Sequence, residues 1–376
     1  MKILICDGLH DSGLSIMQAA DGITVDVPDA PSADEVKRII PEYDALVVRS
    51  RTKVTAEVLE RAEKLKVIGR AGTGVDNIDV QAASARGILV MNTPGANAMA
   101  AAEHTLALMF ALARHIPQAT QSMREGKWEK KKFMGTELYH QTLGIIGLGK
   151  IGSIVADRAL GLKMEVLGFD PYLIPEAVAV LGVECVSLDE LLERSDFITI
   201  HTPLTPETRN FLGRDALKKV KRGVRLLNCA RGGLIDEEAL FEALQDGRVA
   251  GAALDVFAQE PPTGSPLLGL PNMIFTPHLG ASSVQAQANV AKAIAQQIVD
   301  YLQLGLIRNA VNFPSIRARD IERIRPYLAL AQALGRLQGQ LCTPVQRLEI
   351  EYSGSELQEL PHPPLTRMVV KGLLEP

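Results

Sequence analysis

Four apolar stretches in the second half of the chain end in side chains that could do chemistry. The stretches "FITIHT", "VRLLNCARGG", "GAALDVFAQEPP" and "MIFTPHLG" end, in turn, on His201 and Thr202, on Arg231, on Asp255 with Glu260, and on His278. If these stretches are parallel strands of one sheet, their carboxyl ends meet at one edge. Open α/β sheets bind ligands at that edge. The pattern therefore predicts a functional site there.

Arg231, Glu260 and His278 suit the removal of hydrogen from a carbon that carries a hydroxyl group. Histidine titrates in the range that a general base needs, and a carboxylate beside it would hold its ring. The arginine fork would clamp a substrate carboxylate and polarise the neighbouring oxygen. Taken singly, each has an ordinary explanation: a packing or surface histidine, a solvated loop acid, or an ion-pair partner. It is the three together that indicate a catalytic site.

A glycine-rich turn precedes these strand ends. The stretch "TLGIIGLGKIG" spaces Gly147, Gly149 and Gly152 as GxGxxG, with Lys150 and Ile151 inside the turn, between a predicted strand and a predicted helix. Such glycines permit a tight turn and close backbone approach to a pyrophosphate, which the helix N-terminus attracts. The alternative is a plain strand–turn–helix whose glycines serve only packing.

An acidic residue supports the dinucleotide interpretation. Asp170 ends the next strand, "EVLGFD", eighteen residues after Gly152. A carboxylate at this point binds the adenosine ribose hydroxyls and repels a 2′-phosphate. We therefore predict NAD rather than NADP as the cofactor.

Length and composition describe a globular protein. The chain has 376 residues, of which 47% are hydrophobic and 22% charged, and its net charge is −4. That length is enough for two domains. The charge shows no basic stripe, so nucleic acid is not an expected partner. The longest apolar stretch, residues 98–116, carries Glu103, His104 and Arg114, and is too polar for a membrane span.

The chain start and the cysteines bear on location. The start, "MKILICDGLH", has too short an apolar run for a secretory signal. The four cysteines are scattered and form no CxxC pair, so neither disulfides nor a thiol metal site is expected. A reducing cytoplasm fits this pattern, and we predict no bound metal.

Strand-like runs alternate with helical periodicity over the first hundred residues and again from residue 142. This alternation predicts an α/β fold with two Rossmann-like or flavodoxin-like parallel-sheet domains. One long helix is expected from about Ala98 to Met123. Residues 309–319 suggest a linker, and "LEIEYSGS", which begins at Leu348, suggests a strand at the start of an incomplete C-terminal segment.

The motifs "GIIGLGKIG", "HTPLTPET", "NCARGGLIDEEAL", "GAALDVFAQEPP" and "TPHLGASS", in this order, resemble those of the D-isomer-specific 2-hydroxyacid dehydrogenases. The resemblance covers about residues 1–315. It implies that Arg231, Glu260 and His278 are catalytic. The cofactor contacts that it implies are Gly147, Gly149, Lys150, Ile151, Gly152, Asp170, His201, Thr202, Ala230, Asp255 and Gly280. For His201, simple packing is the alternative.

The resemblance also implies a discontinuous domain arrangement. Residues 98–284 would form the NAD-binding Rossmann domain, and residues 1–97 with 285–312 would form the substrate-binding domain. The active-site cleft would lie between the two. Residues 313–376 would begin an intervening domain that the chain does not complete, so we expect no serine-binding regulatory domain in this chain.

The resemblance also implies a substrate site in the first domain. In "GRAGTGVDNID", the backbone of Gly72, Thr73 and Gly74 would receive the substrate carboxylate. Arg49 and Arg70 end strands at the same cleft and suit a phosphate, and Asn97 is expected to contact the substrate as well. For Arg49 the alternative is a solvated strand end.

The expected activity is the NAD-dependent oxidation of a phosphorylated 2-hydroxy acid. One alternative is a family member that acts on unphosphorylated glyoxylate or hydroxypyruvate. Another is a dinucleotide-sensing protein like the family's corepressors, in which turnover is secondary. Because the helix from Ala98 is too apolar for a surface helix, a homodimer through the cofactor domain is expected, with a homotetramer as the alternative.

Overall fold

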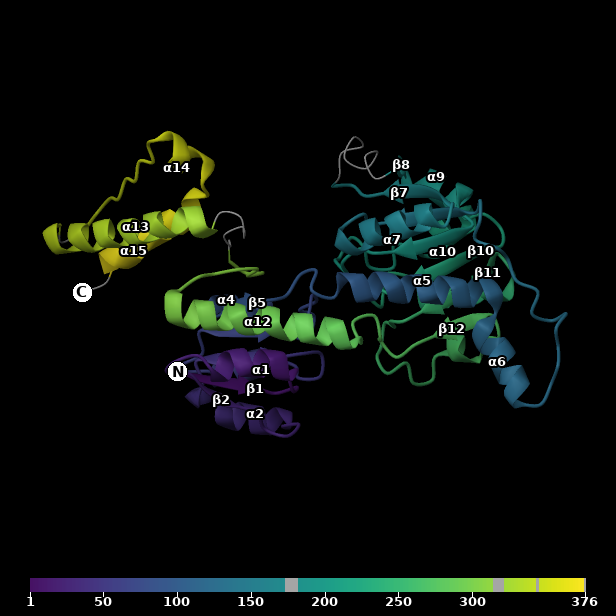
Figure 1. The fold of residues 1–376 in the computed structure, drawn as a ribbon, viewed down its shortest axis with the longest axis horizontal. Helices are drawn as coiled ribbons and strands as arrows, with labels where there is room; N and C mark the ends of the chain where they lie inside the picture. The colour runs from purple at the N-terminus through teal and green to yellow at the C-terminus, as the bar shows by residue number, and fades with distance from the viewer. Residues whose placement is uncertain (173–181, 314–320, 343–344, 375–376) are drawn as a thin grey trace. The chain divides into compact units, whose positions relative to one another are not determined.

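The computed structural model describes residues 1–172, 182–313, 321–342 and 345–374 (Figure 1). It divides into two compact units. The first unit consists of Met1–Pro94 with Ala288–Pro376, and the second of Gly95–Gln287. Each unit is built on a parallel sheet, which confirms the predicted α/β fold.

The first unit contains a five-stranded sheet in the order β2-β1-β3-β4-β5. All its neighbouring strands pair in parallel. This order is that of doubly wound flavodoxin-like sheets. The strands are β1 (Lys2–Ile5), β2 (Thr24–Asp26), β3 (Ala45–Val48), β4 (Val67–Arg70) and β5 (Leu89–Met91).

Helices cover the first sheet. Those within the first hundred residues are α1 (Asp11–Gln18), α2 (Ala33–Ile39), η1 (Ile40–Glu42), α3 (Ala56–Glu60) and α4 (Val80–Ala85). The long helix α12 (Val284–Leu304), which comes late in the chain, packs against α1 and β4 (Figure 1). Two glycines make room for it: a Cβ on Gly69 would lie 2.9 Å from Ile294, and one on Gly13 would lie 2.6 Å from the carbonyl oxygen of Ala291.

The second unit contains a seven-stranded sheet in the order β12-β11-β10-β9-β6-β7-β8. Every pair of neighbours is parallel. The order reverses between β6 and β9, which makes the topological switch point where doubly wound sheets bind dinucleotides. The strands are β6 (Thr142–Ile146), β7 (Glu165–Phe169), β8 (Glu184–Cys185), β9 (Phe197–Ile200), β10 (Val224–Asn228), β11 (Val249–Leu254) and β12 (Met273–Phe275).

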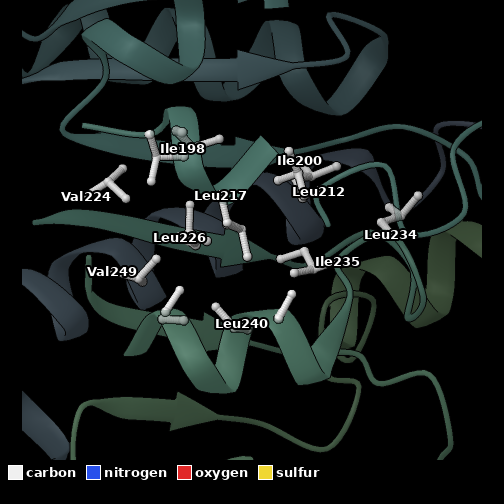
Figure 2. Packing of buried hydrophobic residues seen from close by; sticks show 14 of the residues in the cluster. Ile198, Ile200, Leu212, Leu217, Val224, Leu226, Leu234, Ile235, Leu240 and Val249 are labelled. Carbon is white, nitrogen blue, oxygen red and sulfur yellow. The ribbon is translucent and has the colours of Figure 1, made fainter. Parts of the chain in front are cut away.

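Alternating strand residues supply a hydrophobic core on each face of the second sheet. On one face they pack with α5 (Ala98–Arg114) and α7 (Lys150–Gly161). On the other face they pack with α9 (Leu188–Arg194), α10 (Arg214–Lys219) and α11 (Glu237–Gln245). Figure 2 shows Ile198 and Leu226 of the sheet with Leu217 of α10 and Leu240 of α11 in this second core. Helices cover both faces of the sheet, so a ligand can reach it at the ends of the strands.

The prediction of one helix from Ala98 to Met123 was wrong. The segment forms two helices, α5 and then α6 (Ile116–Arg124), which separate at His115. His115 has a left-handed backbone, with φ of 51°. Pro117 lies in the first turn of α6. A proline lacks the N–H and its ring clashes with the preceding turn, so it is tolerated there but not inside a continuous helix.

The C-terminal segment is helical. Its helices are α13 (Ile321–Leu341), α14 (Ser355–Glu359) and α15 (His362–Leu374). Helices α13 and α15 pack with their backbones close together, since a Cβ on Gly335 would lie 1.9 Å from the carbonyl oxygen of Val369. The predicted strand at residues 348–352 does not form within the described residues 345–374. Ile350 and Tyr352 instead pack against the helix pair, because no neighbouring strand offers a hydrogen-bond ladder. The predicted linker falls partly outside the described residues.

The described residues hold neither a candidate membrane-spanning helix nor a candidate metal site. None of the helices described is long and apolar enough to cross a membrane. No three described histidine, cysteine or acidic side chains are arranged to hold a metal ion.

Candidate functional site

The second sheet brings three predicted catalytic residues to one edge. Strands β10, β11 and β12 are neighbours, and their last residues pair in register as Asn228 with Leu254 and Leu254 with Phe275. Because the strands run parallel, the segments that follow them leave the sheet at the same edge. Arg231, Glu260 and His278 lie in those three segments.

His278 and Glu260 are in direct contact. The Nδ1 atom of His278 lies 2.8 Å from Oε2 of Glu260, and both side chains remain partly exposed to solvent. The other carboxylate oxygen of Glu260 accepts a hydrogen bond from the Phe257 backbone N–H at 3.2 Å. Burial alone raises the pKa of Glu260, but the hydrogen bonds and the charge of His278 hold the pKa below its ordinary value. With Nδ1 bound to a carboxylate, Nε2 of His278 is the ring nitrogen that can take up a proton.

Asp255 organises the segment that carries His278. Its side chain is buried, and it accepts hydrogen bonds from the backbone N–H of Leu279 at 2.7 Å and of Gly280 at 2.8 Å. It also accepts one from the Thr276 hydroxyl at 2.5 Å. Burial acts to raise the pKa of Asp255, but these donors together with His104 lower it overall. Asp255, predicted as a cofactor contact, therefore holds the loop of residues 276–280 in place.

His104 and Thr276, which contact Asp255, were missed as functional residues. Both side chains bind the Asp255 carboxylate. The available signal for His104 was a polar residue inside an apolar helix, which alone does not name a partner. Only the fold brings α5 beside the end of β12.

Arg231 lies in a turn that its neighbours fix. The side-chain amide of Asn228 donates to the Arg231 carbonyl at 2.8 Å, and its oxygen accepts from the Ala230 N–H at 3.0 Å. A Cβ on Gly232 would lie only 1.8 Å from the Phe257 carbonyl oxygen. Glycine at 232 thus allows the turn after β10 to pack on the segment that leads to Glu260.

The glycine turn has an open backbone of the kind that a dinucleotide needs. Gly147 has φ of 92°, and a Cβ there would lie 2.8 Å from the His201 carbonyl oxygen. A Cβ on Gly152 would lie 2.0 Å from the Gly147 carbonyl oxygen, so this glycine closes the turn itself. Gly149, which caps α7, has no protein atom within 4 Å of such a Cβ. Space above the helix N-terminus is therefore free for a pyrophosphate.

Other predicted cofactor residues surround this turn. The Asp170 carboxylate accepts hydrogen bonds from the backbone N–H of Leu148 at 2.9 Å and of Tyr172 at 3.0 Å. The Thr202 hydroxyl is buried without a hydrogen-bond partner in the structure. His201 contacts Thr199, and burial lowers the pKa of His201 to about 4, which keeps it neutral near pH 7. An unsatisfied hydroxyl beside an open glycine turn fits a bound NAD.

Lys150, Ile151, Ala230 and Gly280 complete the predicted cofactor set. Lys150 and Ile151 form the first turn of α7, and the Lys150 side chain lies against Gly95. Ala230 belongs to the turn that Asn228 fixes, and Gly280 to the loop that Asp255 fixes. Ala230 and Gly280 thus lie in segments that follow strands of the second sheet. Lys150 and Ile151 lie at the start of α7, the helix after the glycine turn.

In the first unit, Arg49 follows β3 at the carboxyl edge of the sheet. Its backbone N–H donates to Asp7 at 2.7 Å, and its carbonyl accepts from Asn77 at 2.8 Å. These contacts use the backbone of Arg49 and hold the loop that carries its guanidinium. Sequence reasoning assigned no role to Asp7 or Asn77, since their partners come from other strands.

The predicted carboxylate-binding turn follows β4 at the same edge. Arg70 ends β4, Gly72 has φ of 147°, and its carbonyl accepts from the Thr93 N–H at 2.9 Å. The Thr73 carbonyl accepts from the Asn92 side chain at 2.6 Å. Gly74 continues this turn. The fold thus gathers Arg49, Arg70 and residues 72–74 in the first unit, while Asn97 lies at the start of α5 in the second.

A doubly wound sheet with an open glycine turn and a histidine–glutamate pair at one edge defines a dinucleotide-dependent dehydrogenase. Residues 106–280 match the family model described as "D-isomer specific 2-hydroxyacid dehydrogenase, NAD binding domain". Residues 323–376 match the one described as "D-3-phosphoglycerate dehydrogenase intervening domain". The chain belongs to the D-isomer specific 2-hydroxyacid dehydrogenases, and its cofactor is NAD.

The relatives extend the match to the whole chain. A D-3-phosphoglycerate dehydrogenase from Methanocaldococcus jannaschii is 48% identical over 378 residues, which cover 100% of this chain and 72% of the relative. Another from Bacillus subtilis is 42% identical over 376 residues, which cover 100% of this chain and 71% of that relative. The solved structure of a D-lactate dehydrogenase from Aquifex aeolicus complexed with NAD and lactic acid has a TM-score of 0.74 and 27% identity, covering 84% of this chain and 100% of that one. The resemblance expected from the motifs is confirmed.

Proposed function

We propose that the protein oxidises 3-phosphoglycerate at C2 to 3-phosphohydroxypyruvate with NAD, the reaction that opens serine biosynthesis. The chemistry is carried by the 2.8 Å contact between His278 and Glu260 at the edge of the NAD-binding sheet. The substrate is supported by similarity along the whole chain to relatives named D-3-phosphoglycerate dehydrogenase.

In this proposal His278 is the general base. Its Nε2 atom takes the proton of the C2 hydroxyl while Nδ1–H stays bound to Glu260. Glu260, which is ionised because its pKa is lowered, stabilises the imidazolium that forms. Arg231 binds the C1 carboxylate and the C2 oxygen with its fork. The chemistry that NAD would supply when bound is the acceptance of the hydride from C2.

The edge residues of the second sheet would hold the cofactor. The backbone around Gly147, Gly149 and Gly152 would bind the pyrophosphate at the start of α7. The Asp170 carboxylate would accept hydrogen bonds from the adenosine ribose hydroxyls. The buried Thr202 hydroxyl, which has no hydrogen-bond partner in the structure, would bond to the cofactor. The other predicted cofactor contacts, Asp255 among them, keep the roles proposed from the sequence.

The first unit supplies the groups that recognise the substrate's anionic ends. Arg49 and Arg70 bind the phosphate, and the backbone N–H groups of residues 72–74 bind the carboxylate. Support comes from the fixed backbone of Arg49, which Asp7 and Asn77 hold from two sides. A held loop presents a guanidinium at low entropic cost. Asn97, at the start of α5, contributes a further substrate contact.

The test is the reductive assay, since NADH absorbance reports turnover directly. Wild-type protein and His278→Asn are given 3-phosphohydroxypyruvate, hydroxypyruvate, glyoxylate or pyruvate. The proposal expects a strong preference for the phosphorylated keto acid, and loss of turnover in the variant. Preference for glyoxylate or hydroxypyruvate would overturn the substrate and favour the reductase alternative. NADH binding without turnover of any acid would favour the dinucleotide-sensing alternative.

We infer that the protein works as a homodimer, with a homotetramer as the alternative. Large exposed apolar side chains occur along α5, α6 and the loop that follows. They are Met99, Phe110, Ile116, Met123, Trp128 and Met134, each between 40% and 80% exposed. Monomeric proteins rarely expose so many large apolar groups on adjoining segments. A second copy is the occupant that the family resemblance suggests.

A reducing compartment, the cytoplasm, is the proposed location. All four cysteines are free. Burial raises the pKa of Cys6 and of Cys229 to about 12, so neither thiol ionises readily. Unpaired thiols are typical of proteins that work where disulfides do not form.

A further inference from the structure

His104 is a polar side chain in an apolar helix, and the proposed mechanism gives it no role. It lies on α5, where the neighbours Ala101, Ala102 and Leu108 are buried. Its own side chain is 20% exposed. Its Nε2 atom lies 3.2 Å from Oδ1 of Asp255 and 3.0 Å from the hydroxyl oxygen of Thr276. The ring therefore bridges the first helix of the second unit to the loop that carries His278.

The partners of His104 determine which way its hydrogen bonds run. Asp255 is ionised, because hydrogen bonds lower its pKa despite burial, so its oxygens only accept. The Thr276 hydroxyl donates its one proton in a hydrogen bond to Oδ1 of Asp255 at 2.5 Å. Toward His104 both oxygens are thus acceptors, and Nε2 must carry the proton. The hydrogen bonds therefore assign Nε2 of His104 as a donor.

Asp255, which contacts His104, also forms hydrogen bonds with residues on both sides of His278 and with His278 itself. Its two oxygens hold the N–H groups of Leu279 and Gly280, on the far side of His278 from Thr276. Its backbone carbonyl accepts the His278 N–H at 2.9 Å. His278 itself has φ of 55°, a left-handed conformation that a histidine adopts only when its surroundings hold it there. The loop of residues 276–280 therefore depends on its hydrogen bonds to Asp255.

We propose that His104 is a positioning residue for the reaction. Its Nε2–H completes the set of donors around Asp255 and so fixes the loop in the backbone conformation that presents His278 to Glu260 and to the substrate. Without this donor, Oδ1 of Asp255 keeps Thr276 and Leu279 and Oδ2 keeps Gly280, but the buried carboxylate loses its hydrogen bond to α5. The loop then samples other conformations, and the base spends less time in place. The inference rests on the proposed function only in that His278 is the base.

A purely structural role for His104 is the competing explanation. Under it, the ring fills space under the sheet edge, and its loss lowers stability without a specific effect on the chemical step. The two explanations differ in what a glutamine would do. The side-chain amide of glutamine can place an N–H near the position of Nε2, whereas leucine offers similar bulk and no donor.

The experiment compares His104→Gln with His104→Leu in the NADH assay. Ser195→Ala is the matched control, because Ser195 is buried in the same unit and bonds only to its own helix, at the Leu191 carbonyl. We expect His104→Leu to lose about tenfold in kcat, with the KM values changed far less, since misplacing the base affects the transition state. His104→Gln should recover most of this loss. Ser195→Ala should lower the melting temperature and leave kcat unchanged.

Thr276→Val gives a second route, should His104→Leu fail to fold. It removes the hydroxyl that His104 and Asp255 share, and it should lower kcat as His104→Leu does. A kcat in His104→Leu or Thr276→Val within about twofold of wild type would overturn the inference. So would a glutamine variant as slow as the leucine variant. The assays use whichever keto acid the wild type prefers, so a failure of the phosphorylated substrate would be seen separately in the wild-type panel.

Discussion

The chemistry that we propose for this protein depends on two neighbouring side chains and on what surrounds them. In the proposal, His278 is a base whose ring Glu260 orients through a 2.8 Å contact and whose positive form Glu260 stabilises. Positions 231, 260 and 278 could be predicted because each follows an apolar strand, and parallel strands end together. His104 and Thr276 could not, because a hydrogen bond between distant segments leaves no local pattern in the sequence.

His278→Asn should abolish most of the turnover. Removal of a general base costs about a thousandfold in kcat, and asparagine keeps a polar group of similar size in the left-handed position. NADH absorbance at saturating keto acid measures the rate. NADH fluorescence is the control, and it should show that cofactor binding persists. Retention of a tenth of the wild-type kcat would assign the base elsewhere.

Asp255 should make stability depend on pH. Its pKa is lowered in the folded protein, so the ionised carboxylate stabilises the fold fully above the ordinary carboxyl pKa near 4, and this contribution is lost as the pH falls through the lowered native value. Asp255→Asn removes the charge and should cost about 3 kcal/mol at pH 7. The gap in melting temperature between wild type and variant should narrow as the pH falls from 7 to below 4. A gap that stays constant or widens would contradict this account of Asp255.

Two glycines of the glycine-rich turn have different roles: Gly152 is needed for the turn to close, and Gly149 leaves space for the cofactor. Gly152→Ala places a Cβ 2.0 Å from the Gly147 carbonyl oxygen, so the turn itself must shift and stability should fall by about 2 kcal/mol. Gly149→Ala meets no protein atom within 4 Å, so folding should be unaffected. Its methyl group instead enters the space proposed for the pyrophosphate.

The variants Gly149→Ala and Gly152→Ala should therefore have different effects on stability and on cofactor affinity. Gly149→Ala should keep the wild-type melting temperature and raise the Kd for NADH about tenfold or more, measured by fluorescence titration. Gly152→Ala should lower the melting temperature. Unchanged NADH affinity in a well-folded Gly149→Ala would move the pyrophosphate away from the N-terminus of α7.

Most helices and strands could be predicted from the sequence, and the predictions that were wrong have local causes. Alternation of strand and helix periodicity indicated both parallel sheets, but not their strand orders, which depend on pairing between distant segments. The prediction of a continuous helix from Ala98 to Met123 was wrong at His115 and Pro117, where backbone restrictions outweigh apolar periodicity. Residues 348–352 alternate like a strand, yet a strand needs a neighbour, and in the described segment Ile350 and Tyr352 pack on helices.

At the scale of the whole molecule, the exposed apolar surface on α5 and α6 predicts self-association. Phe110→Glu places a charge on that surface and should convert the proposed dimer to monomer, because burying an unpaired charge is costly. Light scattering after size exclusion measures the mass. Tyr172→Glu, at a residue 93% exposed in the same unit, is the control and should keep the wild-type mass. A wild-type protein that elutes as a monomer would contradict the dimer.

The most direct test of the central claim, a phosphorylated substrate, compares two keto acids that differ only in the phosphate. The measurement is the ratio of kcat/KM for 3-phosphohydroxypyruvate to that for hydroxypyruvate, in wild type and in Arg49→Gln. We expect a high ratio in wild type that falls at least tenfold in Arg49→Gln, with NADH affinity unchanged, because the proposed role of Arg49 is to bind the phosphate. A ratio near one in wild type, or one that Arg49→Gln leaves unchanged, would overturn the phosphorylated substrate.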